Sequence, residues 1–402
     1  MSAVTRKQNE LAKRLLEGLI SINSVNPGTD PDSPGEFEIS EFIRDELRRL
    51  GISVETQRVI GKRRNVIGRI RFGRKIKSSR TLMINAHMDT VPVKGMSIDP
   101  LKPVVKNGFL YGRGAADTKG GLAASIASAG SLLEGGSADL DGELLLTFVV
   151  GEEYLSEGSE KIVEKYEADA AIVCEPTNLE LGLAHKGFCR FLIETFGRPA
   201  HGSVPELGID AIEKAGEIAS AVNKELRPSL QRRKMAHSLA GSPTIHNSII
   251  QGGTDAWNVV PAYCKLGVEA RTIPGVSSDD VLRELRSLAS KIRATEDRKS
   301  HRFKFKISKT MERLPLETSP QEAIVKSIQE SARQAVGKRL AVRGMPYWTD
   351  AAILSQRGHI PSVVLGPGKV EDAHTKDEKV ELSKVYLASE IYKGAIECFL
   401  RK

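Results

Sequence analysis

Short apolar runs alternate with helical stripes in the first and last parts of the chain, and this alternation most restricts its possible folds. The apolar runs predict buried strands over residues 66–70, 82–86, 144–150, 171–173 and 362–365. Apolar positions at helical spacing predict helices over residues 11–19, 37–50, 121–133, 321–334 and 382–399. Strands and helices in alternation are typical of an α/β domain, with helices on both sides of a mixed, mostly parallel sheet.

The middle of the chain has a different order of elements. It predicts a strand, a helix, two strands, a helix and a strand, over residues 189–195, 208–226, 244–251, 263–270, 278–292 and 303–307. This βαββαβ order is that of an α+β ferredoxin-like domain. A chain of 402 residues also exceeds what one core usually organises. We therefore predict an α/β domain of residues 1–184 and 312–402, interrupted by an inserted domain of residues 185–311.

Charge and cysteine content limit the partners and the compartment. The net charge is +8, with basic residues concentrated at 62–80 and 298–309, and neither stretch resembles a nucleic-acid-binding motif. We interpret both as solvated surfaces, or as a general attraction for anionic small molecules. Apolar runs are too short for a membrane helix, the first residues do not resemble a secretory signal, and the four cysteines form no CxxC pair. We expect a cytoplasmic protein with no nucleic-acid or membrane partner.

Histidines and acidic residues follow the predicted strands of the α/β domain. They are His87, Asp89, Asp117, Glu152, Glu153, Glu175 and His374. In open α/β sheets the carboxyl ends of the strands are where ligands bind, so these side chains are candidates for one site. Oxygen ligands with two imidazoles suit Zn, Co or Mn, and the set is not a thiolate cluster. A site so rich in carboxylates would hold about two divalent ions.

Each of these residues also has an ordinary structural interpretation. Asp117 could be the N-cap of the helix that follows it, and the pair Glu152 and Glu153 could be solvated surface. The glycine-rich segment around Asp117 does not fit a phosphate-binding loop, because a carboxylate there would repel a phosphate. The metal interpretation therefore rests on the whole set of residues.

Six motifs in order resemble the M20 metallopeptidase and deacylase family, in the group of acetylornithine deacetylase and succinyl-diaminopimelate desuccinylase. They are HMDTVPV from His87, GRGAADTKGG from Gly112, GEE from Gly151, CEP from Cys174, GRPAHGSVPELGIDA from Gly197, and the GPG and AHTKDE segments near the C-terminus. The resemblance covers nearly the whole chain.

The resemblance implies two metal sites that share one carboxylate. It assigns His87, Asp117 and Glu175 to one ion, and Asp117, Glu153 and His374 to the other. Asp89 would then support His87, and Glu152 would be the general base. It also implies a cis peptide bond between Asp117 and Thr118, where many relatives have methionine in place of Thr118.

The inserted domain resembles the lid or dimerisation domain of the family. By this resemblance His201 contacts the reacting carbonyl, often from the opposite subunit of a homodimer, and Asn258 and Arg271 bind substrate. Arg271 is suited to a substrate carboxylate because a guanidinium can donate two parallel hydrogen bonds.

The resemblance implies a metal-dependent amidohydrolase of amino-acid biosynthesis. It would remove an acetyl or succinyl group from an N-acyl amino acid by attack of a metal-bridged hydroxide, with Zn expected and Co or Mn as alternatives. Three other functions remain open: a di- or tripeptidase or carboxypeptidase acting on short peptides, a two-metal phosphoesterase, and a non-catalytic binding dimer. The sequence does not decide which acyl amino acid or peptide is the substrate.

Overall fold

The structure is a computed structural model, and it describes residues 3–73, 79–135, 139–232, 236–297 and 303–401. The chain divides into two compact units. Unit 1 consists of residues 1–183, 318–344 and 349–402, and unit 2 of residues 184–317 and 345–348. In the part of the chain that is described, no helix is both long enough and apolar enough to cross a membrane.

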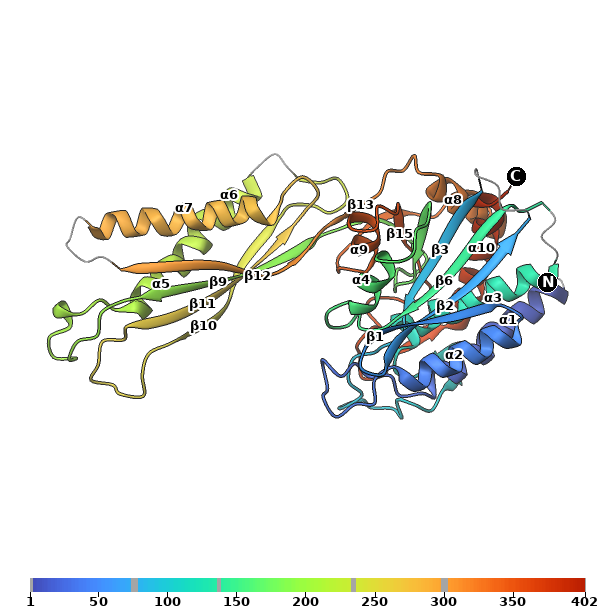
Figure 1. Cartoon of the computed structure of the whole chain (residues 1–402), viewed down its shortest axis with the longest axis horizontal. Helices are drawn as coiled ribbons and strands as arrows, with labels where there is room; N and C mark the ends of the chain where they lie inside the picture. The colour runs from blue at the N-terminus through green and yellow to red at the C-terminus, as the bar shows by residue number, and fades with distance from the viewer. Residues whose placement is uncertain (1–2, 74–78, 136–138, 233–235, 298–302, 402) are drawn as a thin grey trace. The chain divides into compact units, whose positions relative to one another are not determined.

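Unit 1 is built on a mixed sheet whose central strands are parallel (Figure 1). The strands lie in the order β1 (Ser53–Ile60), β2 (Arg63–Phe72), β6 (Gly142–Val149), β3 (Arg80–His87), β7 (Ala170–Val173), β15 (Ser362–Val364) and β8 (Leu181–His185). Strand β3 is parallel to β6 and β7, and β7 is parallel to β15, whereas β1, β2 and β8 pair antiparallel with their neighbours. The carboxyl ends of four central strands therefore meet at one edge.

Helices cover both faces of this sheet, as an α/β domain requires. On one side are α1 (Ala3–Ile20), α2 (Phe37–Arg49), α3 (Gly120–Gly135), α8 (Ala323–Val336) and α10 (Leu382–Phe399), and on the other are α4 (Glu157–Val163) and α9 (Ala351–Gln356). Helix α3 is almost entirely buried, and its small residues allow a close approach to the sheet. A Cβ added at Gly121 would lie 2.8 Å from Cβ of Cys174, so only glycine lets the helix start beside this strand end.

Unit 2 has the ferredoxin-like order that the sequence predicts. Its elements are β9 (Gly187–Phe196), α5 (Ala211–Ala221), β10 (Thr244–Gly252), β11 (Tyr263–Thr272), α7 (Ser278–Asp297) and β12 (Lys304–Arg313). The strands form an antiparallel sheet in the order β10-β11-β9-β12, and α5 and α7 pack on one face. Inward residues alternate along β9, where Cys189, Phe191 and Ile193 are buried in the core. The fold class, α/β with an α+β ferredoxin-like part, is thus confirmed.

Shorter elements complete the two units. They are β4 (Val104–Lys106), β5 (Phe109–Tyr111), η1 (Ala115–Lys119), η2 (Pro205–Leu207), η3 (Val222–Leu226), α6 (Arg227–Arg232), β13 (Leu316–Glu317), β14 (Val342–Met345) and β16 (Lys379–Glu381). Strands β16, β5 and β4 form a small separate sheet.

Part of the basic stretch at 62–80 differs from the solvated surface that we expected. Arg63, Arg64 and Arg69 are only partly exposed and form ion pairs with glutamates of unit 1, at N···O distances of 2.6, 2.7 and 2.6 Å. These cations therefore neutralise carboxylates of their own unit. Residues 74–78 and 298–302, which belong to the two basic stretches, lie outside the described residues.

Candidate metal centre

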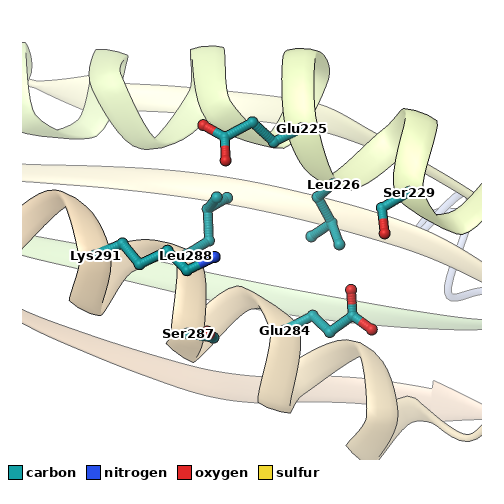
Figure 2. A pocket seen from close by; sticks show the side chains of 7 residues that line it. All are labelled: Glu225, Leu226, Ser229, Glu284, Ser287, Leu288 and Lys291. Carbon is teal, nitrogen blue, oxygen red and sulfur yellow. The ribbon is translucent and has the colours of Figure 1, made fainter.

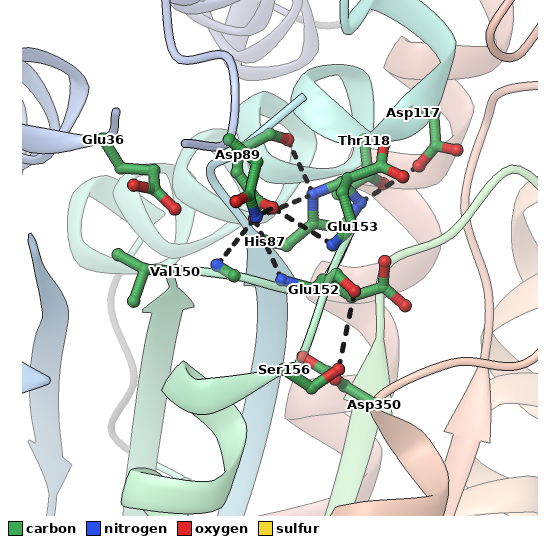
Figure 3. Close-up of polar contacts among 12 residues, drawn as sticks. Glu36, His87, Asp89, Asp117, Thr118, Val150, Glu152, Glu153, Ser156 and Asp350 are labelled. Carbon is green, nitrogen blue, oxygen red and sulfur yellow. Dashed lines mark hydrogen bonds and ion pairs between the residues drawn. The ribbon is translucent and has the colours of Figure 1, made fainter. Parts of the chain in front are cut away.

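The predicted ligands of unit 1 lie together at the carboxyl edge of the central strands. His87 is the last residue of β3, Glu152 and Glu153 follow β6, and Glu175 follows β7. Figure 3 shows the side chains of His87, Asp117, Glu152 and Glu153 gathered above these strand ends. The parallel pairing of β3 with β6 and β7 places the three strand ends side by side.

Asp117 lies between the two histidines, with one oxygen facing each ring. Its Oδ1 is 3.0 Å from Nε2 of His87, and its Oδ2 is 3.2 Å from Nε2 of His374. Glu153 Oε1 is 3.1 Å from the same nitrogen of His374, and Glu175 Oε2 is 4.0 Å from Nε2 of His87. The arrangement pairs one further carboxylate with each histidine and leaves Asp117 common to both.

Two groups of three side chains have ligand atoms close enough for one ion. His87, Asp117 and Glu153 form one group and His87, Glu152 and Glu175 the other, with the ligand atoms of each group within 4.8 Å of one another. All seven unit 1 residues singled out from the sequence, including Asp89 and His374, thus belong to one region of the structure.

The second nitrogen of His87 fixes the direction of the ring. Nδ1 of His87 lies 2.9 Å from the backbone oxygen of Asp89, so this nitrogen donates and Nε2 is left to accept or to ligate. The carboxylate of Asp89 lies farther from the ring, with its nearest oxygen 3.6 Å from Nδ1. Asp89 therefore supports His87 through its carbonyl group.

The Asp89 carboxylate instead holds the loop that carries Glu152 and Glu153. Oδ1 accepts from the backbone N–H groups of Gly151 and Glu152 at 3.0 and 3.1 Å, and Oδ2 accepts from that of Glu153 at 3.1 Å. Oδ2 also accepts from Nδ2 of Asn26 at 2.6 Å. Four donors occupy this carboxylate, which explains why it is not available to the His87 ring.

The turn that presents Asp117 has the backbone that the resemblance implies. The peptide bond between Asp117 and Thr118 is cis. The hydroxyl of Thr118 donates to the backbone oxygen of Cys174 at 2.7 Å, which connects the turn to the residue before Glu175. Thr118 supplies no ligand, yet it joins two segments that carry candidate ligands.

Burial and crowding of like charges dominate the electrostatics of the centre. Burial raises the pKa of Glu152 and of Glu175 well above the ordinary value, and it also raises the pKa of Glu153. Hydrogen bonds to Asp117 and Glu153 raise the pKa of His374 to about 10. Burial opposes the protonation of His87, but Asp117 and Glu175 outweigh it and raise the pKa of this ring as well.

These directions are those expected of a crowded set of buried carboxylates, which a bound cation would stabilise. Buried carboxylates without a compensating charge are costly, and here protonated histidines would have to provide that charge. A divalent ion would do the same while the imidazoles stay neutral and ligate. Oxygen and imidazole nitrogen donors in this ratio fit Zn, Co or Mn. The residues present therefore fit the metal ions that the resemblance implies.

Sequence reasoning missed several buried residues that contact the candidate ligands or the segments beside them. They are Asn26, Arg113, Asp350 and Glu378. Asp350 is buried beside the Glu152 loop (Figure 3). It accepts a hydrogen bond from the hydroxyl of Ser159 at 2.6 Å. Its sequence signal was an acidic residue at the start of a short helix, which is common on protein surfaces.

The three predicted residues of unit 2 fall at two ends of its sheet. His201 and Asn258 are exposed and lie in adjacent loops, since His201 bridges to Val259 and the N–H of Gly202 donates to the carbonyl of Asn258 at 2.7 Å. Arg271 is near the far end of β11, where its Nη2 lies 2.8 Å from Oε1 of Glu269. Tyr263 and Arg271 are eight positions apart on that strand, or roughly 26 Å.

Unit 2 also contains a cavity of about 290 Å³ that is separate from these residues. It lies between α7 and the η3–α6 segment, and Figure 2 shows Glu225, Glu284 and Lys291 among its lining side chains. None of the ten residues predicted from the sequence lines it. The cavity therefore does not compete with the carboxylate cluster of unit 1 as the candidate centre.

Comparison with known proteins agrees with the geometry. The chain is 30% identical over 375 residues to acetylornithine deacetylase of Vibrio campbellii, covering 90% of this chain and 91% of that protein. It is 28% identical over 368 residues to N-formyl-4-amino-5-aminomethyl-2-methylpyrimidine deformylase of Bacillus subtilis, covering 86% and 85%.

Among solved structures, a dinuclear metal-binding peptidase of the M20 family from Bacillus subtilis has the same fold. Its TM-score is 0.72 at 19% identity, covering 98% of this chain and 99% of that one. The sequence pattern described as peptidase family M20/M25/M40 matches residues 83–397. The chain therefore belongs to peptidase family M20/M25/M40 and is a hydrolase of that family.

Proposed function

We propose that the protein is a metal-dependent amidohydrolase that removes a small acyl group, acetyl or succinyl, from an N-acyl amino acid. The observation that carries this proposal is the position of Asp117 between His87 and His374, with Glu152 beside the same cluster. Similarity to acetylornithine deacetylase over most of both chains supports the acyl amino acid as substrate class.

The contacts of each histidine support the two ligand sets that the resemblance implies. His87, Asp117 and Glu175 would hold one ion and Asp117, Glu153 and His374 the other. Bound divalent ions would polarise the scissile carbonyl and activate water at neutral pH, with Zn expected and Co or Mn as alternatives.

Glu152 is suited to move the proton. Its backbone is fixed by Asp89, whereas its carboxylate has no hydrogen bond or ion pair with any residue that the structure describes. It would accept a proton from the attacking water and return it to the leaving amine. Glu153, one residue further, is engaged with His374 and so has a different role.

In the proposed enzyme, each substrate would be bound by residues of unit 2 from both chains of a homodimer. His201 and Asn258 lie in loops at the Tyr263 end of its sheet, and Arg271 lies near the other end, eight positions or roughly 26 Å from Tyr263 along β11. One unit 2 cannot bring both ends to a substrate as small as an acyl amino acid. We therefore assign Arg271 to the substrate carboxylate, and His201 and Asn258 of the partner subunit to the reacting carbonyl and substrate in a homodimer.

The edge strand β10 supports dimer formation through unit 2. Ile249 and Ile250 on this strand are 60% and 55% exposed. Exposed apolar side chains on an uncovered edge strand promote association, and a second copy of the same edge would cover them.

The proposal is tested with metal-free protein and a panel of N-acetyl and N-succinyl amino acids and dipeptides, with and without Zn, Co or Mn. We expect release of free amine from one class of acyl amino acid only when metal is added. Cleavage of dipeptides alone would instead establish a peptidase. Two bound ions without any cleavage would favour a non-catalytic binding dimer.

A further inference from the structure

The buried ion pair of Arg113 and Glu378, next to the turn that presents Asp117, is not used in the proposed function. Glu378 lies four residues after His374, and both Glu378 and Arg113 are buried. Nη1 of Arg113 donates to Oε2 of Glu378 at 2.7 Å. The two residues belong to the AHTKDE and GRGAADTKGG motifs, of which the proposed function uses only His374 and Asp117.

The Glu378 carboxylate also binds the backbone of the turn that presents Asp117. Oε2 accepts from the N–H of Gly114 at 3.0 Å, and Oε1 accepts from those of Ala116 and Asp117 at 3.0 and 3.1 Å. Both oxygens are therefore used, and three backbone N–H groups of the turn depend on one carboxylate. Charged acceptors of backbone N–H groups make stronger hydrogen bonds than neutral ones.

The same residue fixes the segment that carries His374. The backbone oxygen of Glu378 accepts from the N–H of Gly112 at 3.0 Å, so side chain and main chain of one residue contact the same turn. Nη2 of Arg113 donates to the carbonyl of Pro92 at 3.0 Å, which anchors the guanidinium from the other side. His374 Nε2 and Asp117 Oδ2 then lie 3.2 Å apart.

We propose that Glu378, held by Arg113, is a positioning residue that sets the spacing of Asp117 and His374 and thereby the affinity of the centre for divalent ions. This inference rests on the proposed function, in which the centre binds metal. Since Asp117 faces both histidines, a looser turn weakens the binding of both ions.

Measuring metal affinity and thermal stability on the same variants distinguishes a positioning role of Glu378 from a role in fold stability alone. The probe is Co²⁺ alone, titrated into metal-free protein and followed by its visible absorption, beside thermal unfolding of the same metal-free protein. The variants are Glu378→Gln, which removes the charge at constant shape, and Arg113→Lys, which keeps a cation but loses the planar fork. Asp377→Asn is the matched control, because Asp377 is the exposed neighbour of Glu378.

We expect Glu378→Gln to weaken both Co²⁺ equivalents by about 10- to 100-fold, as loss of an outer partner of a ligand usually does. Arg113→Lys weakens them less, and Asp377→Asn leaves both unchanged. Unchanged Co²⁺ affinity in Glu378→Gln, with or without a lower Tm, overturns the inference and leaves the proposed function intact. Absence of Co²⁺ binding by the unaltered protein overturns both. If Glu378→Gln does not fold, the Co²⁺ affinity of Arg113→Lys is compared with that of the unaltered protein instead. An unchanged affinity then overturns the inference.

Discussion

Glu152 and Glu153 are neighbours in the chain, yet their carboxylates have different partners. Gly151, with a φ of 88°, bends the chain after β6, so the two side chains need not point to opposite faces as in a strand. Glu153 contacts His374, and Glu152 stays near His87 and Glu175. The difference supports separate roles for a ligand and a base.

Replacement of Glu152 tests the base directly. We expect Glu152→Gln to lower kcat by about 10²- to 10⁴-fold, because a positioned general base contributes a factor of this size. Metal content by atomic emission should stay at the level of the unaltered protein. Glu167→Gln, an exposed glutamate after α4, is the control and should keep full activity. Near-normal kcat in Glu152→Gln would remove this residue from the mechanism.

Thr118 gives a second prediction for a single residue. Thr118→Val keeps the shape but removes the donor to the Cys174 carbonyl, and we expect a loss of about 1–3 kcal/mol in the free energy of unfolding. Urea titration of metal-free protein measures this loss. Thr118→Ser keeps the hydroxyl and should lose less. Equal stability of the valine and serine variants would show that the hydrogen bond contributes nothing.

For whole elements, the sequence was most informative where an apolar pattern is long. Helix α10 has the bounds that its pattern predicts, and α2 differs only at its last residue. Helices α4 and α9 were missed because seven and six residues show fewer than two full turns of periodicity. Strand β1 was missed because its residues are mostly exposed or half-buried and polar.

In the candidate site, too, only residues marked by a local sequence pattern could be predicted. Ligands at the ends of strands could be predicted because each follows an apolar run directly. The groups that hold them could not, since Glu378 contacts Asp117 across 261 positions and Asn26 contacts Asp89 across 63. Only the folded arrangement of the elements brings such pairs together.

Helix α3 allows a prediction at this scale. In Gly121→Ala the new Cβ would meet the Cβ of Cys174 at 2.8 Å, so the helix or the strand end must shift. We expect a cost of about 1–3 kcal/mol in the free energy of unfolding. Gly135→Ala, at the open end of the same helix, should be neutral or stabilise by up to about 1 kcal/mol. Urea unfolding of the metal-free proteins compares them, and equal stabilities would contradict the packing argument.

At the scale of the whole molecule, the central question is which chain supplies His201. If His201 acts within its own chain, each chain contains a complete site. If it acts across a homodimer, each site combines Glu152 of one chain with His201 of the partner subunit. The positions of His201 and Arg271 at separate ends of the unit 2 sheet favour the second arrangement.

Mixing two inactive variants distinguishes these arrangements. His201→Ala and Glu152→Ala are each expected to be inactive alone. After the two are unfolded together and refolded, half of the dimers are mixed, and in each mixed dimer one site has both residues intact. Activity should then recover to about a quarter of that of the unaltered protein. If His201 acts in its own chain, every site in the mixture lacks one of the two residues. No recovery, with mixed dimers verified by mass spectrometry, would therefore assign His201 to the site of its own chain.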